Sequence, residues 1–220
     1  MVTDVLTATN QDEVYSSNRL PGYFFLGDFY VMLEIIDKLP PRGTVIQIGT
    51  FLGRSAKFWA ELFRQQNKIY NIICLDTYDN TADDVFNQHL RSKFAGDIAT
   101  VTSFLHKKKT NLEIVIDNLK QYGEIQHYVY DIFVNSPEDI QASNIVCVFD
   151  DAVHTRQGVK QSFDSWFNRL EYDGIYCGHD YSLNFLEVME TVNNIAAEND
   201  LKLQLPRKDS SMYYLIKKRV

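Results

Sequence analysis

The stretch Val45-Ile46-Gln47-Ile48-Gly49-Thr50-Phe51-Leu52-Gly53-Arg54-Ser55 decides how this chain folds. A short, mostly apolar run is followed by two glycines spaced four residues apart, and helical periodicity begins at Arg54. A strand-to-helix turn with two glycines lets a ligand approach the backbone, and the helix N-terminus offers unpaired N–H donors. The stretch therefore predicts either a turn that binds a carboxylate or phosphate, or a tight structural turn without a ligand.

The glycine spacing argues against two common phosphate-binding motifs. The dinucleotide fingerprint requires Gly-x-Gly-x-x-Gly, whereas this turn reads Gly-x-x-x-Gly, so NAD and FAD are disfavoured. A P-loop would need Gly-Lys-Ser or Gly-Lys-Thr after the strand, and the chain has neither there.

Other apolar runs extend this strand into a sheet. Such runs occur at 44–48, 69–75, 127–134, 145–149 and 174–177. They are nearly continuous rather than alternating, which is typical of parallel strands covered on both faces. Residues 54–66, 155–170 and 182–198 show helical periodicity and predict crossover helices. Residues 201–205 and 212–216 flank a polar turn and predict an antiparallel hairpin, which brings the expected sheet to seven strands.

The remaining segments are less regular. Residues 1–43 carry many aromatic side chains before the turn Leu-Pro-Pro-Arg-Gly, and we expect a helix that either covers the mouth of a pocket or packs on the sheet. Residues 44–220 would then form the main domain. The stretch 77–109 has no clear period, and its run Lys107–Lys109 is typical of a solvated surface.

Composition narrows the class of partner. The chain has 220 residues, 45% hydrophobic and 23% charged, which fits one globular domain. Its 22 basic and 29 acidic side chains give a net charge of −7, which disfavours nucleic acids and anionic membranes and favours a small-molecule partner. The first basic residue is Arg19 and no apolar region follows the start, so we expect no secretory signal. The longest apolar run has five residues, and we expect a soluble, cytoplasmic protein. Cys74, Cys147 and Cys177 lack metal-site spacing and predict buried, reduced thiols.

An acidic residue ends the second predicted strand. Asp76 follows Ile73-Cys74-Leu75 and lies 23 residues after Gly53. In doubly wound sheets an acid at this place accepts hydrogen bonds from the two hydroxyls of a ribose. Asp76 therefore predicts nucleoside binding beside the glycine turn, or alternatively a cap on the turn before Thr77.

Acids and histidines follow the last two parallel strands. Asp150-Asp151-Ala152-Val153-His154 ends one strand, and Gly178-His179-Asp180-Tyr181 ends the next. Neighbouring parallel strands bring their carboxyl ends to one crevice, so these groups should converge. Two carboxylates suit Mg²⁺ or Mn²⁺, and a histidine nearby could remove a proton from a hydroxyl that the cation acidifies. The alternative is that Asp151 and His154 only cap the following helix.

Three blocks of the chain, 45–55, 74–78 and 149–181, together resemble class I S-adenosylmethionine-dependent methyltransferases. More narrowly, the chain is similar to the branch of macrocin and mycinamicin sugar O-methyltransferases, whose hallmark is Asp-Gly-x-His followed by Gly-His-Asp-Tyr. The resemblance covers about residues 40–217 and implies a Rossmann-like, doubly wound α/β fold.

The resemblance also implies roles for individual residues. It places the methionine end of the cofactor among Gln47, Gly49, Thr50, Gly53, Arg54 and Ser55. Its ribose would lie on Asp76 beside Thr77 and Tyr78, and its adenine between Asn135 and Ser136. It makes Asp151, which also borders the cofactor, a metal ligand together with His179 and Asp180. His154 matches the catalytic base, and Asp180 acts with it.

Two positions depart from the family pattern. Gln47 stands where the family usually has an acid that anchors the cofactor's amino group, although glutamine can still accept a hydrogen bond. Asp150-Asp151-Ala152 replaces the usual apolar-Asp-Gly, so either aspartate could face the metal. We favour Asp151 because it keeps the family's three-residue spacing to His154.

These features together predict a metal-assisted O-methyltransferase that acts on a hydroxyl of a sugar or other small metabolite. Two alternatives stay open: a cofactor-binding module without catalysis and an NAD-linked oxidoreductase. Nucleic-acid methylation is disfavoured because Asn135-Ser136-Pro137-Glu138 does not match Asn-Pro-Pro-aromatic. The sequence does not identify the acceptor, and it leaves open whether the chain forms a homo-oligomer.

Overall fold

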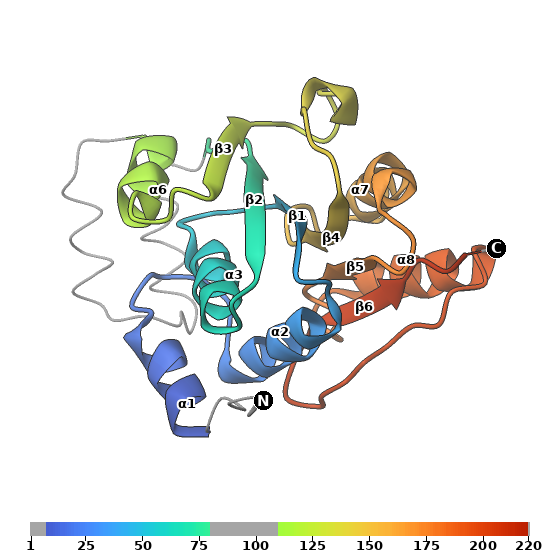
Figure 1. The fold of residues 1–220 in the computed structure, drawn as a ribbon. Coiled ribbons are helices and arrows are strands. Elements are labelled where there is room, and N and C mark those ends of the chain that lie inside the picture. The colour runs from blue at the N-terminus through green and yellow to red at the C-terminus, as the bar shows by residue number, and fades with distance from the viewer. Residues whose placement is uncertain (1–7, 80–109, 220) are drawn as a thin grey trace.

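The computed structural model describes residues 8–79 and 110–219, and a six-stranded sheet runs through its centre (Figure 1). The strands are β1 (Arg42–Ile48), β2 (Ile69–Asp76), β3 (Ile125–Val129), β4 (Ile145–Asp150), β5 (Ile175–Gly178) and β6 (Tyr213–Ile216). Their order is β3-β2-β1-β4-β5-β6; β1 to β5 are parallel and β6 is antiparallel to β5. Strand order reverses between β1 and β4, which in open α/β sheets is where ligands bind.

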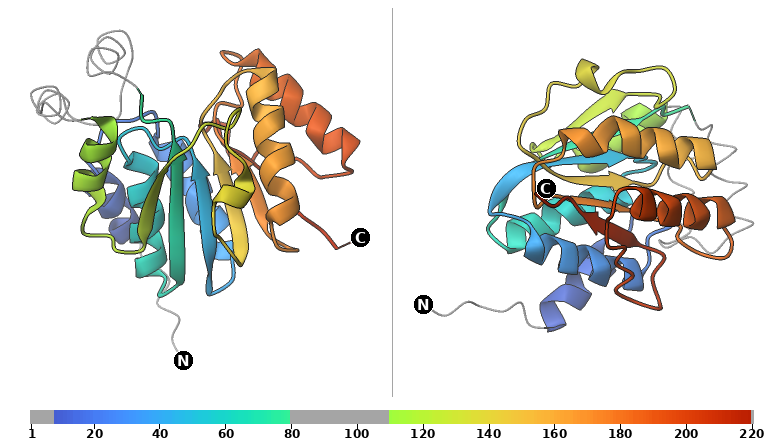
Figure 2. Two further views of the ribbon diagram at one scale, coloured as in Figure 1. Left: turned by 90° about the horizontal axis from the view of Figure 1, so that it is seen from above. Right: turned by 90° about the vertical axis from the view of Figure 1, so that its right-hand side faces the viewer.

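Helices cover both faces of this sheet (Figure 2). On one face lie α1 (Ala8–Ser17), α2 (Leu26–Lys38), α3 (Arg54–Gln65) and α6 (Asn111–Leu119), and on the other lie α7 (Arg156–Trp166) and α8 (Leu186–Glu198). Two short 3₁₀ helices, η1 (Pro137–Asp139) and η2 (Phe167–Arg169), complete the described elements. This arrangement confirms the predicted doubly wound α/β fold.

The core consists of two apolar layers separated by the sheet. Phe29 of α2 and Phe58 and Trp59 of α3 are fully buried in the first layer. Trp166 of α7 and Val192 of α8 pack into the second. Every residue of β4 is buried, which explains why its sequence is an unbroken run and not an alternating one.

The prediction of seven strands is wrong for the described part of the chain, which has six. The segment 201–205 forms no strand and meets β6 only through an isolated bridge, in which Gln204 and Tyr214 exchange N–H···O bonds of 3.0 and 3.1 Å. Pro206 has no N–H to donate, so the ladder does not extend from this bridge toward the turn.

The third strand also ends earlier than predicted, at Val129 instead of residue 134. Two side chains turn the chain there: Asp131 Oδ1 accepts from Phe133 N at 2.8 Å, and Asn135 Oδ1 accepts from Asp131 N at 2.8 Å. Such local bonds favour turns over strands even where apolar residues lie between them.

Other predictions concern the rest of the chain. The three cysteines are buried and unpaired, as expected. None of the helices within 8–79 and 110–219 combines the length and apolar character needed to cross a membrane. The lysine run 107–109 lies outside the described residues.

Candidate active site

A cavity of about 930 Å³ opens at the carboxyl ends of the parallel strands. Its walls come from the segments that follow β1, β2, β3, β4 and β5, from residues 21–25 and Asp28 of the N-terminal segment, and from Asp209 and Ser211 before β6. The volume lies near the upper end of the range for small-molecule pockets. The topology therefore brings most of the predicted site residues into one place.

The glycine turn after β1 depends on left-handed backbone. Gly49 has φ +84° and Gly53 has φ +90°, conformations that glycine adopts without steric cost. A Cβ on Gly49 would lie 2.1 Å from the carbonyl oxygen of Asp151, so the end of β4 packs directly against this turn. Close contact between the two strand ends places the turn beside the acid and histidine residues.

Asp76 holds the glycine turn through backbone hydrogen bonds. Its Oδ2 accepts from Thr50 N at 2.7 Å and from Phe51 N at 2.9 Å, and its Oδ1 accepts from Tyr78 N at 2.9 Å. A carboxylate can accept about four hydrogen bonds, so Oδ1 keeps capacity for a donor in the cavity that Asp76 lines. The predicted proximity of Asp76 to the turn is thus observed, and the residue also fixes the shape of that turn.

The two residues after Asp76 point in different directions. Thr77 lines the cavity and donates from Oγ1 to Asp79 Oδ1 at 2.6 Å. Tyr78 is buried in the first apolar layer, with its hydroxyl 3.2 Å from His127 Nδ1, and it does not line the cavity. Thr77 is thus placed to touch a ligand, whereas the side chain of Tyr78 serves the core.

Asn135 and Ser136 do not line the cavity either, because the chain turns before it reaches them. Ser136 instead caps η1 by accepting from Glu138 N. The wall beyond β3 is built from Tyr130, Asp131 and Ile132. Sequence reasoning missed these residues because the strand was extended too far.

Gln47 holds the glycine turn through hydrogen bonds to both of its ends. It is fully buried, and its Nε2 donates to Ser55 Oγ at 2.9 Å and to the carbonyl oxygen of Gly49 at 3.1 Å. Its Oε1 is buried without a hydrogen-bond partner. Gln47 lies behind the cavity wall, whereas Thr50 and Ser55 form part of it.

Arg54 ties the N-terminal segment to the turn. Its guanidinium is buried and donates to three carbonyl oxygens, from Nε to Phe24 at 3.0 Å and from Nη1 to Asn18 and Leu20 at 2.7 and 2.8 Å. Asn18 Nδ2 in turn donates to the Arg54 carbonyl at 3.0 Å. Arg54 borders the cavity, and these bonds fix residues 18–24 as part of its wall.

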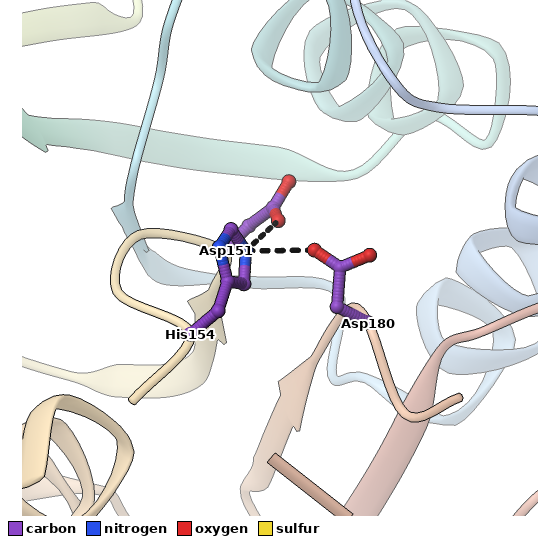
Figure 3. Close-up of side chains that lie close together, drawn as sticks. All are labelled: Asp151, His154 and Asp180. Atoms are coloured by element: carbon purple, nitrogen blue, oxygen red, sulfur yellow. Dashed lines mark ion pairs between the residues drawn. The ribbon is translucent and has the colours of Figure 1, made fainter. Parts of the chain in front are cut away.

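Asp151, His154, His179 and Asp180, here called the carboxylate–histidine cluster, meet at the ends of β4 and β5. Figure 3 shows the His154 ring facing both aspartates, with ion pairs from one ring nitrogen to each of them. His154 Nε2 lies 2.7 Å from Asp180 Oδ2 and 3.9 Å from Asp151 Oδ1. His179 Nδ1 lies 3.2 Å from Asp180 Oδ1 and 3.6 Å from Asp151 Oδ1.

Asp150 faces away from this cluster. Its Oδ2 accepts from Tyr176 Oη at 2.9 Å on the opposite side of the strand, and burial raises its pKa to about 6. The geometry thus agrees with the choice of Asp151 over Asp150 as the residue that faces the cavity.

Burial and charge oppose one another in the cluster. Burial disfavours protonation of His154, but hydrogen bonds and charge from Asp151 and Asp180 outweigh it and raise the pKa of His154 to about 10. Burial alone would raise the pKa of Asp180, but its ion pairs with His154 and His179 hold that pKa well below the usual range. Without another cation, the imidazoles carry the positive charge that stabilises the aspartates.

A divalent cation fits this donor set. One donor atom from each of Asp151, His154 and Asp180 lies within 4.8 Å of the other two. In addition, His179 Nδ1 is buried and has no hydrogen-bond partner. Carboxylate oxygens together with imidazole nitrogen suit first-row transition metals, and carboxylates with water suit Mg²⁺.

Asp28 is a site residue that sequence reasoning missed. It lies in the first turn of α2, is 2% exposed, and its Oδ2 lies 3.2 Å from His179 Nε2. The available signal was an acid within the otherwise apolar run Phe24-Phe25-Leu26-Gly27-Asp28-Phe29, because a buried acid requires a partner.

Comparison with known proteins supports a common fold. The O-methyltransferase NovP is 14% identical and has a TM-score of 0.61, with 87% of this chain and 78% of NovP covered. CalS11, a TDP-rhamnose 3'-O-methyltransferase of calicheamicin biosynthesis, is 12% identical with a TM-score of 0.57 and coverage of 94% and 92%. An S-adenosylmethionine-dependent O-methyltransferase from Thermotoga maritima is 12% identical with a TM-score of 0.55 and coverage of 96% and 71%. At these identities the likeness shows the fold alone.

Sequence comparison identifies the family. Curated protein sequences give no significant match to this chain. The family model Methyltransf_24, described as a methyltransferase domain, matches residues 46–181, which run from the end of β1 through β5 and contain the carboxylate–histidine cluster. This match favours a methyltransferase over the alternative of an NAD-linked oxidoreductase. The chain belongs to this methyltransferase domain family and is a methyltransferase.

Proposed function

We propose that this protein is an S-adenosylmethionine-dependent O-methyltransferase that uses a divalent cation and acts on a hydroxyl of a sugar or other small metabolite. One observation carries the proposal: a glycine turn with its acid, Asp76, opens into the same cavity as the carboxylate–histidine cluster. A nucleoside seat and a hydroxyl-activating group side by side are what methyl transfer to oxygen requires.

The seat for the methyl donor follows from the cavity wall. Thr50 and Ser55 would border its methionine part, and Asp76 would accept from its ribose. Because β3 ends at Val129, the adenine would lie against Asp131 and Ile132 rather than Asn135 and Ser136.

Charge in the cavity suits a cationic donor and a neutral acceptor. The lining formed by residues 8–79 and 110–219 contains seven aspartates (Asp28, Asp76, Asp79, Asp131, Asp151, Asp180 and Asp209), while Arg54 is its one arginine and already bonds three carbonyls. A sulfonium is stabilised in such a field, whereas a polyphosphate is repelled. This favours an uncharged hydroxylated acceptor.

The cluster supplies the chemistry of the acceptor. Asp151 and Asp180 would hold the cation, which when bound orients and acidifies the acceptor hydroxyl. His154 Nε2 takes the hydroxyl proton while the oxygen forms its bond to the methyl carbon and the sulfur keeps the electron pair of the broken bond. Holding the reacting atoms in line can supply about 7–11 kcal/mol of the barrier.

Ligand-dependent unfolding followed by methyl transfer tests this function. S-adenosylmethionine at 100 times its Kd should stabilise the protein by about 2.7 kcal/mol. Label from the methyl group should then reach members of a panel of hydroxylated sugars and phenols, with transfer lost on chelation. Stabilisation without transfer to any member would favour the non-catalytic module, and no stabilisation would reject the proposal.

A further inference from the structure

Asp28 and His179 form a buried pair that joins the N-terminal segment to the end of β5. Asp28 is 2% exposed and His179 is 5% exposed, and Asp28 Oδ2 lies 3.2 Å from His179 Nε2. The two residues are 151 positions apart in the chain and come from α2 and from the turn after β5. The family's methyltransferase model matches residues 46–181, so Asp28 lies outside the matched block whereas His179 lies within it.

Asp28 is held rigidly on both oxygens. Oδ2 also accepts from Phe25 N at 2.9 Å, and Oδ1 accepts from Ser210 Oγ at 2.6 Å and from Ser211 N at 3.2 Å. The Phe24 ring stacks on the His179 imidazole with a centroid distance of 6.0 Å and an interplanar angle of 27°. The imidazole therefore has a fixed orientation, set by groups outside the carboxylate–histidine cluster.

The other ring nitrogen of His179, Nδ1, faces the cluster and forms ion pairs there, but no hydrogen bond of normal geometry. Nδ1 is buried, has no hydrogen-bond partner, and lies 3.2 Å from Asp180 Oδ1 and 3.6 Å from Asp151 Oδ1. A buried imidazole nitrogen that lies beside two carboxylates without a hydrogen bond of normal geometry is placed to bind a cation that the same carboxylates hold. Histidines that bind metals typically donate their second N–H to a carboxylate, which is the place that Asp28 occupies.

We propose that Asp28 is a positioning residue for a nitrogen ligand of the cation. Asp28 fixes the proton of His179 on Nε2 and directs Nδ1 at the cation between Asp151 and Asp180. The nitrogen ligand makes the site favour Mn²⁺ over Mg²⁺. The inference rests on the proposed function in that a cation binds there. A site with an imidazole nitrogen suits first-row transition metals, whereas Mg²⁺ prefers oxygen from carboxylates and water.

Replacement of Asp28 by asparagine tests the positioning role. The carboxamide of Asn has one NH₂ group in place of a carboxylate oxygen. If this group faces His179 Nε2, it donates to that nitrogen and forces the His179 proton onto Nδ1. If it faces the Ser211 N–H instead, two donors meet and the side chain loses the hydrogen bond that holds it in place. Titration with MnCl₂ should show affinity reduced about 10–100-fold in Asp28→Asn, the range typical of second-layer partners of metal ligands. Ser210→Ala is the matched control, because it removes a bond to Asp28 without touching His179, and its Mn²⁺ affinity should stay within about twofold of the parent.

Pulsed EPR of the Mn²⁺-loaded protein tests the ligand directly. The parent should show hyperfine coupling to an imidazole nitrogen. His179→Asn places an amide oxygen or nitrogen near the position of Nδ1, and it should abolish the imidazole coupling and reduce the ratio of Mn²⁺ to Mg²⁺ affinity. His154→Ala should keep the coupling, because His154 acts as base and not as ligand in this proposal.

The outcomes separate this inference from the proposed function. Imidazole coupling that survives in His179→Asn, or Mn²⁺ affinity unchanged in a folded Asp28→Asn, would overturn the role of the pair while leaving methyl transfer intact. If Asp28→Asn does not fold, the His179→Asn spectrum decides. If the parent protein does not bind Mn²⁺, this inference and the metal part of the proposed function are both overturned. If the parent protein does not bind S-adenosylmethionine, only the methyl donor of the proposed function is rejected.

Discussion

His154 is the residue on which the proposed chemistry depends most. Its Nε2 is 2.7 Å from Asp180 Oδ2, and it lies at the cavity side of the turn after β4. A positioned general base typically contributes 10²- to 10⁴-fold to a rate. His154→Ala should therefore reduce turnover by about that factor, while the affinity for S-adenosylmethionine, measured by calorimetry, stays unchanged. Full turnover in the variant would remove His154 from the mechanism.

The protonation of His154 makes cation binding depend on pH. Its pKa is about 10 in the folded protein against about 6.5 for a free imidazole, so the proton stabilises the fold fully below pH 6.5, and this stabilisation is lost as the pH rises through about 10. A cation between Asp151 and Asp180 competes with this proton and should release it. Mn²⁺ affinity should consequently rise with pH between 7 and 9.

Counting the protons released on Mn²⁺ binding tests whether the cation deprotonates His154. Calorimetry of Mn²⁺ binding in buffers of different ionisation enthalpy gives the number of protons released at pH 8. The count should fall by about one in His154→Ala relative to the parent. An equal count in both proteins would show that His154 is not the group that the cation deprotonates.

At the scale of elements, the glycine turn after β1 shows why two glycines are not equivalent. A Cβ at Gly49 would lie 2.1 Å from the Asp151 carbonyl oxygen, which belongs to the backbone, whereas a Cβ at Gly53 would meet the end of the Leu119 side chain at 2.8 Å. Both substitutions also force a left-handed backbone on alanine, at a cost of about 1–3 kcal/mol.

Gly49→Ala should therefore destabilise the protein more than Gly53→Ala does, because a leucine side chain can rotate and the end of β4 cannot move freely. Chemical denaturation of both variants measures the difference. Gly49→Ala should also lose more affinity for S-adenosylmethionine than Gly53→Ala does. The reverse order of stabilities would contradict the packing of this turn against β4.

The end of β3 gives a second prediction for an element. Asp131 lines the cavity, whereas Ser136 caps η1 outside it. Asp131→Asn keeps an acceptor for Phe133 N but removes the charge, and it should weaken S-adenosylmethionine binding. Ser136→Ala is the control and should bind the methyl donor as the parent does. Weaker binding in Ser136→Ala alone would restore the site expected from the sequence.

These two elements also show how far the sequence alone reaches. The turn after β1 was predicted because glycine spacing and an apolar run are local signals, and the convergence of Asp76, Asp151 and Asp180 follows from parallel topology. The end of β3 was predicted wrongly because Ile132-Phe133-Val134 is apolar, while the turn depends on side-chain bonds of Asp131 and Asn135. The seventh strand is also missing, because residues 201–205 pair with β6 at one bridge only and Pro206 prevents pairing from that bridge toward the turn.

For the whole molecule, apolar layers cover both faces of the sheet, and the N-terminal segment completes the wall of the cavity. Arg54 bonds to three carbonyls of residues 18–24, and Asp28 bonds to His179 and to the loop at 210–211. Neither pairing follows from sequence patterns, because both join distant segments through single side chains. The N-terminal segment is thereby part of the cavity in this structure, and its closing role over a bound acceptor remains a prediction.

Loss of the Arg54 bonds should loosen that wall without unfolding the sheet. Arg54→Met keeps an unbranched apolar chain but removes all three donors. Hydrogen exchange should become faster in residues 18–25, while the amides of β1 and β4 keep their protection. Uniformly faster exchange across the sheet would show that Arg54 serves global stability and not the attachment of this segment.

The central claim is that the carboxyl ends of neighbouring strands hold a methyl donor and a cation in one cavity. Crystals grown with S-adenosylhomocysteine and MnCl₂, measured at the manganese absorption edge, test it directly. The account predicts an anomalous peak in contact with Asp151, His179 Nδ1 and Asp180, and a ribose whose hydroxyls meet Asp76. A peak elsewhere, or a ribose away from Asp76, would contradict it.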